Sequence, residues 1–258
     1  MTQKQIRQLT GILLVVGAIL VNIPYALLIS TFDYPDILRA STSDILIQFS
    51  EGGSRLIWTW LAFAWVGMPI LLAILWLPRA LKDEKNSDKG QLVGNVATFF
   101  GATSLMAQMI GLLRWPFVVP VLARLYTAPT ATEATRDAVA AVFQAVHQYG
   151  GVVIGEHIGQ SFIILWMVLL SVSMLRQASA PCWLPWTGFV AAGIYALAQG
   201  EVLSTVLPGL QYWSEAGLVG SLMWIGWLIA LGVVLLRKAR TMSYEYTGSH
   251  SPRGVGAI

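Results

Sequence analysis

The sequence predicts an all-α polytopic integral membrane protein, built as one bundle of six transmembrane helices. Of its 258 residues, 56% are hydrophobic and only 11% are charged, whereas about 25% of the residues in soluble domains are charged. The mean hydropathy is +0.65, and the 11 tryptophans suit the aromatic belts found at both membrane interfaces. The net charge of +3 is small, and we attribute it to membrane topology rather than to nucleic-acid binding.

Six stretches provide the roughly 20 mostly apolar residues that a membrane-spanning helix needs. The predicted spans are residues 9–30, 55–78, 93–117, 151–175, 184–207 and 216–236, within a single domain of residues 1–240. The first stretch is too long for a secretory signal and has no small-residue cleavage site, so we interpret it as an uncleaved span. In the third, Pro116 and Pro120 predict a break at the outer end. Residues 241–258 are predicted to form a disordered tail.

The charges of the connecting segments predict how the bundle is oriented. Basic residues collect in the N-terminal segment, in two of the connections and after the last span, and acidic residues collect in the remaining connections. The basic group is Lys4, Arg7, Arg79, Lys82, Lys85, Lys89, Arg176, Arg237, Lys238 and Arg240, and the acidic group is Asp33, Asp36, Asp44, Glu51, Glu133, Asp137 and Glu215. Because cytoplasmic loops are rich in Lys and Arg, both termini are expected in the cytoplasm.

Two segments of the acidic side have helical patterns of their own. Residues 37–49 carry apolar residues that suit a short interfacial helix, and residues 139–146 show the i, i+3, i+4, i+7 spacing of one helix face. Thr130 and Glu133 offer a capping box for the second of these helices. We expect both to be short amphipathic helices on the outer face of the bundle.

One outer segment carries a resemblance. TFDYPDILR (residues 31–39), followed by EGGSRLIWTWLAF (residues 51–63), resembles segments of small multi-spanning bacterial membrane proteins of unknown function. The resemblance implies the same membrane architecture and a location in the bacterial inner membrane. It implies no particular activity.

Charged residues inside the predicted spans are the main functional signal. A charge at membrane depth is costly, so it usually faces a partner or a water-filled cavity. At 1.5 Å per residue, the predicted span ends place Glu156, His157 and Glu201 about 8–9 Å below the outer surface, and Arg114 ends the third span on the same side. Gln160 and Gln199 lie close to them in sequence. We therefore expect one polar layer in the outer part of the membrane.

The same region carries a helix-packing signal. Gly151, Gly155 and Gly159 recur every four residues, which predicts a stripe that lets a neighbouring helix approach closely.

Three explanations of the polar layer remain open. It holds the helices together, with Arg114 paired to Glu156 or Glu201 and His157 hydrogen-bonded to the other carboxylate. Alternatively, it is a water-accessible pocket in which Glu156 and His157 titrate. A divalent metal site formed by Glu156, His157 and Glu201 is the third explanation, although no spacing demands it. His147 lies about 15 Å from His157 along one helix, too far for both to bind one haem iron.

Other chemistry finds little support in the sequence. No zinc or phosphate-binding motif is present, and no cofactor is predicted. The single cysteine, Cys182, excludes an intrachain disulfide.

Three functions are consistent with these observations. The first is a membrane protein that binds, senses or moves a small solute or protons at an outward-facing site. The second is an accessory subunit of a larger membrane complex, with the glycine stripe as a docking face. The third is an intramembrane enzyme that uses Glu156 and His157 as acid and base. The expected partners are the lipid bilayer, a small ligand, and other membrane subunits or further copies of the chain, but no nucleic acid.

Overall fold

The computed structural model describes residues 1–82 and 87–248, and all regular elements in these ranges are helices. In chain order they are α1 (Gln3–Leu20), α2 (Asn22–Phe32), η1 (Asp36–Arg39), α3 (Thr42–Trp65), α4 (Met68–Leu81), α5 (Ser87–Phe117), α6 (Val119–Thr127), α7 (Glu133–Val146), η2 (His147–Ile158), α8 (Gly159–Gln177), α9 (Trp183–Leu197), α10 (Gln199–Ser204) and α11 (Ala216–Gly248). Lys85 and residues 249–258 of the predicted tail lie outside the described ranges. α11 continues to Gly248, within the segment predicted as the tail.

Five helical stretches in the described residues are long and apolar enough to cross a membrane. They are Gln3–Phe32, Thr42–Leu81, Gly90–Thr127, Glu133–Gln177 and Ala216–Thr241. The predicted span 184–207 is divided between α9, which has 15 residues, and the short α10. The chain is therefore a helical, multi-pass membrane protein, and the structure does not by itself establish a sixth span.

Proline residues explain why several long stretches are interrupted. A proline ring clashes with the carbonyl group four residues earlier in a helix. Pro69 accordingly follows the end of α3 at Trp65 by four residues, and Pro24 lies four residues beyond the end of α1 at Leu20. The break predicted around Pro116 and Pro120 is confirmed, because α5 ends at Phe117 and α6 begins at Val119.

The two segments predicted to form outer helices differ from the prediction in detail. Residues 37–49 are divided between η1 and the start of α3, which continues into the next stretch through a kink at Gly53. Gly53 has φ +55°, a value that glycine adopts readily because it has no Cβ. A helix, α7, covers the second segment, but it continues directly into η2, and its first turn is capped by Thr132, whose side chain accepts a hydrogen bond from the Thr135 amide. The predicted cap at Thr130 is wrong by two positions.

The core consists of two clusters at different heights in the bundle. The larger one joins α1, α4, α8, α9 and α11, and is made mainly of aliphatic residues. The second joins α2, α3, α5, α6 and α7, and contains a stack of buried aromatic rings. Within it, Trp60 and Trp115 lie with ring centroids 4.6 Å apart and planes at 11°. This stack holds the end of α5 in place, which matters because Arg114 precedes Trp115.

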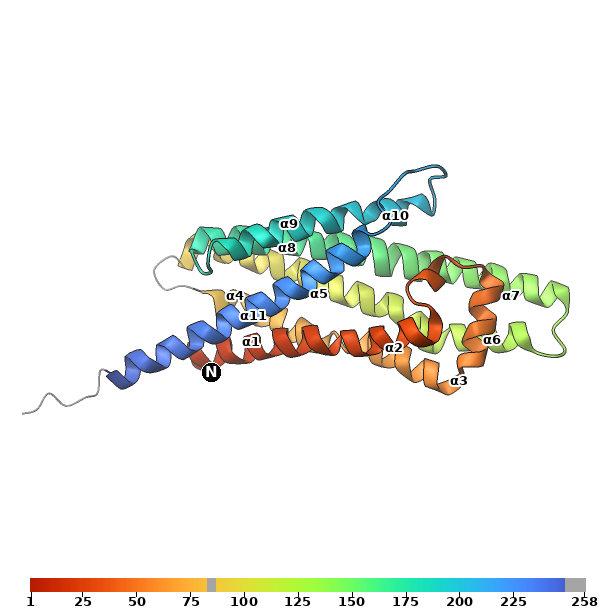
Figure 1. The fold of residues 1–258 in the computed structure, drawn as a ribbon, viewed down its shortest axis with the longest axis horizontal. Helices are drawn as coiled ribbons and strands as arrows, with labels where there is room; N and C mark the ends of the chain where they lie inside the picture. The colour runs from red at the N-terminus through yellow and green to blue at the C-terminus, as the bar shows by residue number, and fades with distance from the viewer. Residues whose placement is uncertain (83–86, 249–258) are drawn as a thin grey trace, which may run out of the picture.

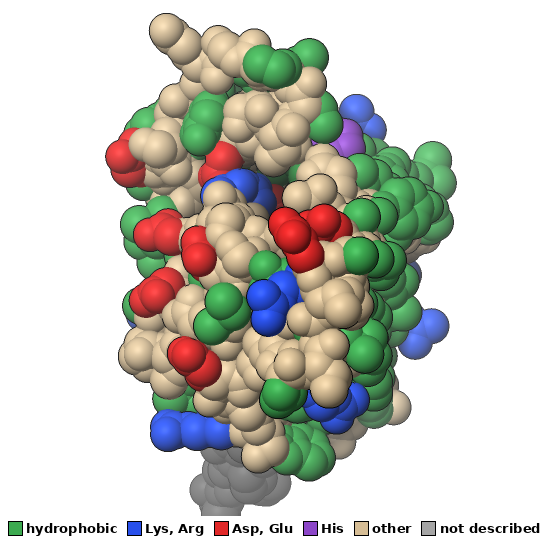
Figure 2. Space-filling model, turned by 90° about the vertical axis from the view of Figure 1, so that its right-hand side faces the viewer, with side chains coloured by type: hydrophobic (Ala, Val, Ile, Leu, Met, Phe, Trp, Pro, Cys, Tyr) green, Lys and Arg blue, Asp and Glu red, His purple; other side chains and the backbone are tan. Residues whose placement is uncertain are grey.

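The two ends of the elongated bundle (Figure 1) differ in charge: one carries the described members of the predicted basic group, and the other carries the predicted acidic group together with Arg39, Arg124 and Arg136. At the basic end, Arg7 Nε donates to the Ala80 carbonyl at 3.0 Å, and Lys238 Nζ donates to the Ser179 carbonyl at 2.7 Å. Figure 2 looks onto the opposite end and shows acidic side chains spread over it, with basic side chains between them. The exposed acidic residues there are Asp33, Asp36, Asp44, Glu51, Glu133, Asp137 and Glu215. We call this face the acidic end.

Candidate functional site

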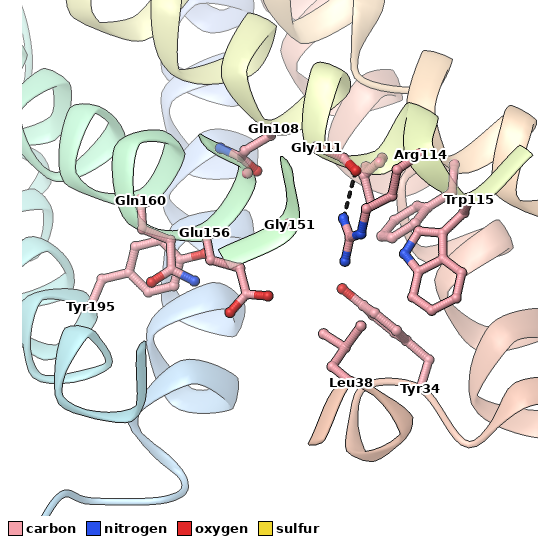
Figure 3. Close-up of a pocket in the computed structure, with 13 residues that line it drawn as sticks. Tyr34, Leu38, Gln108, Gly111, Arg114, Trp115, Gly151, Glu156, Gln160 and Tyr195 are labelled. Carbon is pink, nitrogen blue, oxygen red and sulfur yellow. Dashed lines mark hydrogen bonds between the residues drawn. The ribbon is translucent and has the colours of Figure 1, made fainter. Parts of the chain in front are cut away.

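A cavity of about 140 Å³ lies between α5, η2, α9 and the segment from Tyr34 to Arg39, which we call the outer segment. Its polar lining residues come from all four: Gln108 and Arg114 from α5, Glu156 from η2, Tyr34 from the outer segment and Tyr195 from α9. Gln160, at the start of α8, completes the polar lining. Figure 3 shows these side chains converging on one space from different helices.

Arg114 is a buried cation whose hydrogen bonds are incomplete. Its residue is only 8% exposed, Nη1 donates to the Gly111 carbonyl at 2.5 Å, and the guanidinium lies 5.1 Å from the centroid of the Trp115 ring. Its Nε is buried and has no hydrogen-bond partner. The cation–π contact stabilises the charge in part, but one edge of the guanidinium is left without an acceptor.

The η2 segment supplies the facing wall of the cavity. It is a π-helix of 12 residues, a conformation that occurs mostly as short bulges and often at functional sites. A Cβ on Gly155 would come within 3.2 Å of the Gly111 Cα, and one on Gly151 would lie 2.5 Å from the Arg114 Cζ. A Cβ on Gly159 would lie 2.6 Å from a side-chain carbon of Gln108. All three stripe glycines therefore face α5 inside the chain, which leaves the stripe unavailable as a docking face for a partner.

The carboxylates of the polar layer pair with Arg39, not with Arg114. Arg39 Nη2 lies 2.6 Å from Glu156 Oε2 and 3.3 Å from Glu201 Oε1. These are the ion pairs within 4 Å in the described part of the chain, so the expected pairing of Arg114 with Glu156 or Glu201 is corrected. Glu156 and Glu201 do meet, as their predicted depth implied, but a cation from the outer segment joins them.

Arg39 reaches this position because η1 is fixed against neighbouring helices. The carbonyl of Leu38 lies 3.1 Å from His147 Nε2, and Gln48 donates to Asp33 at 3.0 Å. Burial is the largest influence on the pKa of Arg39 and acts to lower it, but the charges of Glu156 and Glu201 and the hydrogen bond to Glu156 together outweigh burial and raise the pKa above its ordinary value. Arg39 therefore stays charged across the ordinary pH range.

Sequence reasoning missed Arg39 because it lies outside every predicted span and counted only as a loop charge. A signal was available: it ends the TFDYPDILR segment, which was singled out for another reason.

His157 belongs to a different set of contacts from the one expected. Its Nδ1 lies 2.7 Å from the side-chain oxygen of Gln199, and the Gln199 amide donates to Gln160 Oε1 at 2.6 Å. It does not bond to a carboxylate in this arrangement. The three side chains instead link α10 to η2 and α8, at the edge of the cavity.

The described residues do not have the side-chain arrangement that the metal-site hypothesis requires. Among the described residues, no group of three His, Cys, Asp or Glu side chains is arranged to hold a metal ion, so Glu156, His157 and Glu201 do not form one. His147 is buried and stacks on Phe143, with ring centroids 5.3 Å apart.

The site as a whole contains two cations and two anions. Arg39 and Arg114 balance Glu156 and Glu201. Burial also raises the pKa of the Tyr34 phenol, so this side chain stays neutral in the cavity wall. The arrangement can present a guanidinium edge, a carboxylate oxygen and neutral hydroxyl and amide groups to a small molecule.

The comparisons with known proteins identify a family but no activity. The match of the family described as a domain of unknown function (DUF4386) spans residues 9–232, so the chain belongs to that family. Neither the curated proteins nor the solved structures contain a match to the chain.

Proposed function

We propose that this DUF4386 member is a membrane protein that binds a small polar solute in the cavity between α5, η2 and the outer segment. The observation that carries the proposal is Arg114, which is buried against the cavity with Nε unpartnered. A buried unsatisfied donor costs about 1–3 kcal/mol, and more when it is charged. Such a group is expected to have a role that offsets its cost.

A purely structural role explains the polar layer less well. If the layer existed only to hold helices together, each charge would be paired. Arg39, Glu156 and Glu201 fit that description, but Arg114 has no carboxylate within 4 Å in the described part of the chain. Glu156 Oε1 is also buried without a partner. The cavity between them is the place where both missing partners can be supplied.

The proposed topology places the cavity near the outer surface. We propose that α9 and α10 together form a sixth span, and that the basic end faces the cytoplasm of a bacterial cell, as cytoplasmic loops collect Lys and Arg. Both termini are then cytoplasmic and the solute enters from the acidic end. The lack of an evident inverted repeat in this sequence favours binding or sensing over transport.

Thiol labelling in intact cells tests the opening of the cavity and its orientation together. In a Cys182→Ser background, a Gln160→Cys chain should react with a charged, membrane-impermeant methanethiosulfonate added outside. Gln160 lines the cavity. In the unsubstituted chain, labelled separately, Cys182 is exposed at the basic end and should react only after permeabilisation.

Glu133→Cys in the same background is the control for the acidic end, because Glu133 is exposed at the start of α7. A cavity cysteine that reacts from neither side would refute an accessible site. A cavity cysteine that reacts only after permeabilisation, as Cys182 is expected to, would refute the proposed orientation.

A further inference from the structure

We infer that the solute is a small zwitterion with an apolar substituent, such as an α-amino acid with an aliphatic side chain. Its anionic group would lie at Arg114, its cationic group at Glu156, and its substituent in a second cavity that adjoins the first. This inference rests on the proposed function and specifies which solute the site takes.

The Arg114 side of the cavity suits a carboxylate. Nη1 is occupied by the Gly111 carbonyl, whereas Nε is unpartnered. A guanidinium presents its donors in a planar fork that matches the two oxygens of a carboxylate. In Figure 3 the guanidinium points into the space bounded by the Tyr34 ring, and no ion pair within 4 Å joins it to a carboxylate of the described residues.

The Glu156 side suits an ammonium group. One carboxylate oxygen, Oε2, is held by Arg39, and the other, Oε1, is buried with no hydrogen-bond partner. Figure 3 shows this carboxylate directed into the same space from the side opposite Arg114. Because the described residues contain no ion pair between Glu156 and Arg114 within 4 Å, a ligand can lie between the two groups and contact both.

Charge balance favours a zwitterion over a simple ion. The four charged groups, Arg39, Arg114, Glu156 and Glu201, sum to zero, and net charge at membrane depth is costly. A simple anion would satisfy Arg114 but leave the site negative and Glu156 Oε1 unpartnered. A simple cation would pair with Glu156 but leave the site positive and Arg114 Nε unpartnered. A zwitterion supplies both missing partners and keeps the sum at zero.

A second, mainly apolar cavity provides room for a substituent. Its volume is about 90 Å³, and it shares Phe63, Gln108 and Leu112 with the first cavity. Its other walls come from the helix breaks near Val21 and Gly67 and from α11. The inference places the apolar group of a ligand held at Arg114 beyond these shared residues, where its burial contributes binding energy in proportion to the apolar area removed from water.

Isothermal titration of the purified full-length chain in detergent, with four matched probes, tests the inference. The probes are L-leucine, 4-methylpentanoate, 3-methylbutylamine and glycine, which respectively keep all three features or lack the ammonium, the carboxylate or the side chain. L-leucine should bind at least tenfold more tightly than each of the others. A difference of less than tenfold for either single-charge probe overturns the zwitterion assignment, and a similar result for glycine overturns the role of the second cavity.

Variants localise the binding. Arg114→Gln should weaken L-leucine binding at least tenfold, whereas Arg124→Gln, which changes an exposed arginine on α6, should leave it unchanged. Equal weakening in both variants, or in neither, contradicts the site. If Arg114→Gln does not fold, the four probes titrated into the unmodified chain still test the zwitterion assignment by themselves.

Failure of the inference differs from failure of the proposed function. If none of the four probes binds but urea or glycerol does, the zwitterion assignment is wrong and a polar solute site remains. If neither neutral solute binds, the proposed function is refuted together with the zwitterion assignment.

Discussion

The pairing of Arg39 with two carboxylates predicts a specific pattern of energetic coupling. Replacing Arg39 with glutamine removes the partner of Glu156 Oε2 at 2.6 Å and that of Glu201 Oε1 at 3.3 Å. Glu156 then has neither oxygen paired, because Oε1 is already without a partner. Stability should fall because a largely buried carboxylate is left alone.

The magnitude follows from distance and exposure. The side chains of Arg39, Glu156 and Glu201 are 31%, 18% and 34% exposed, so the pairs lie between the buried and the surface limits. Hydrogen bonds to charged groups contribute about 1.5–3 kcal/mol when buried, and exposed ion pairs about 0.2–1 kcal/mol. We therefore expect a coupling energy of about 1.5 kcal/mol between Arg39 and Glu156, and of about 0.5 kcal/mol between Arg39 and Glu201.

Double-mutant cycles measure both couplings. The free energies of unfolding of Arg39→Gln, Glu156→Gln, Glu201→Gln and the two double variants would be obtained from reversible unfolding in mixed micelles of increasing SDS fraction. Arg136→Gln, an exposed arginine on α7 at the same end of the bundle, is the control and should change stability by less than about 0.5 kcal/mol. A third cycle combines Arg114→Gln with Glu156→Gln, and a coupling in it larger than that of Arg39 with Glu156 would refute the pairing.

Two further substitutions test the packing around the site and in the core. Gly111→Ala should destabilise the chain by about 2 kcal/mol, because its Cβ would lie 2.6 Å from the backbone Cα of Gly155, which cannot move aside as a side chain can. Gly150→Ala is the matched control, with its nearest neighbour at 3.9 Å, and equal thermal stability of the two variants would contradict this packing. Trp227→Phe should cost about 1–2 kcal/mol, since its buried indole donates to the Leu184 carbonyl at 2.9 Å. The exposed Trp186→Phe should be close to neutral in the same measurement, and a loss as large as that of Trp227→Phe would contradict the assignment.

Much of the architecture follows from local sequence. Apolar stretches of sufficient length require helices, because a backbone within the membrane must satisfy its own hydrogen bonds. The break around Pro116 and Pro120 was predictable for the same local reason, since a proline ring excludes the preceding turn. The separation of basic from acidic residues between the two ends also follows from the order of spans and loops along the chain.

Other features depend on contacts that no local pattern reports. The division between α9 and α10 occurs in a stretch with no proline to mark it, so the sequence predicted one continuous span there. Thr132 and Thr130 are both good caps, and only the course of the chain before α7 decides between them.

The polar site shows most clearly where sequence reasoning reaches its limit. The sequence alone predicted that Glu156 and Glu201 lie at one depth, because an expected depth follows from counting residues along helices of known rise. Only the tertiary structure decided that Arg39 joins them and that Arg114 faces a cavity. The physical reason is that an ion pair depends on the direction in which each helix face points and on how a loop folds back over the bundle, and neither is encoded by the spacing of residues along one segment.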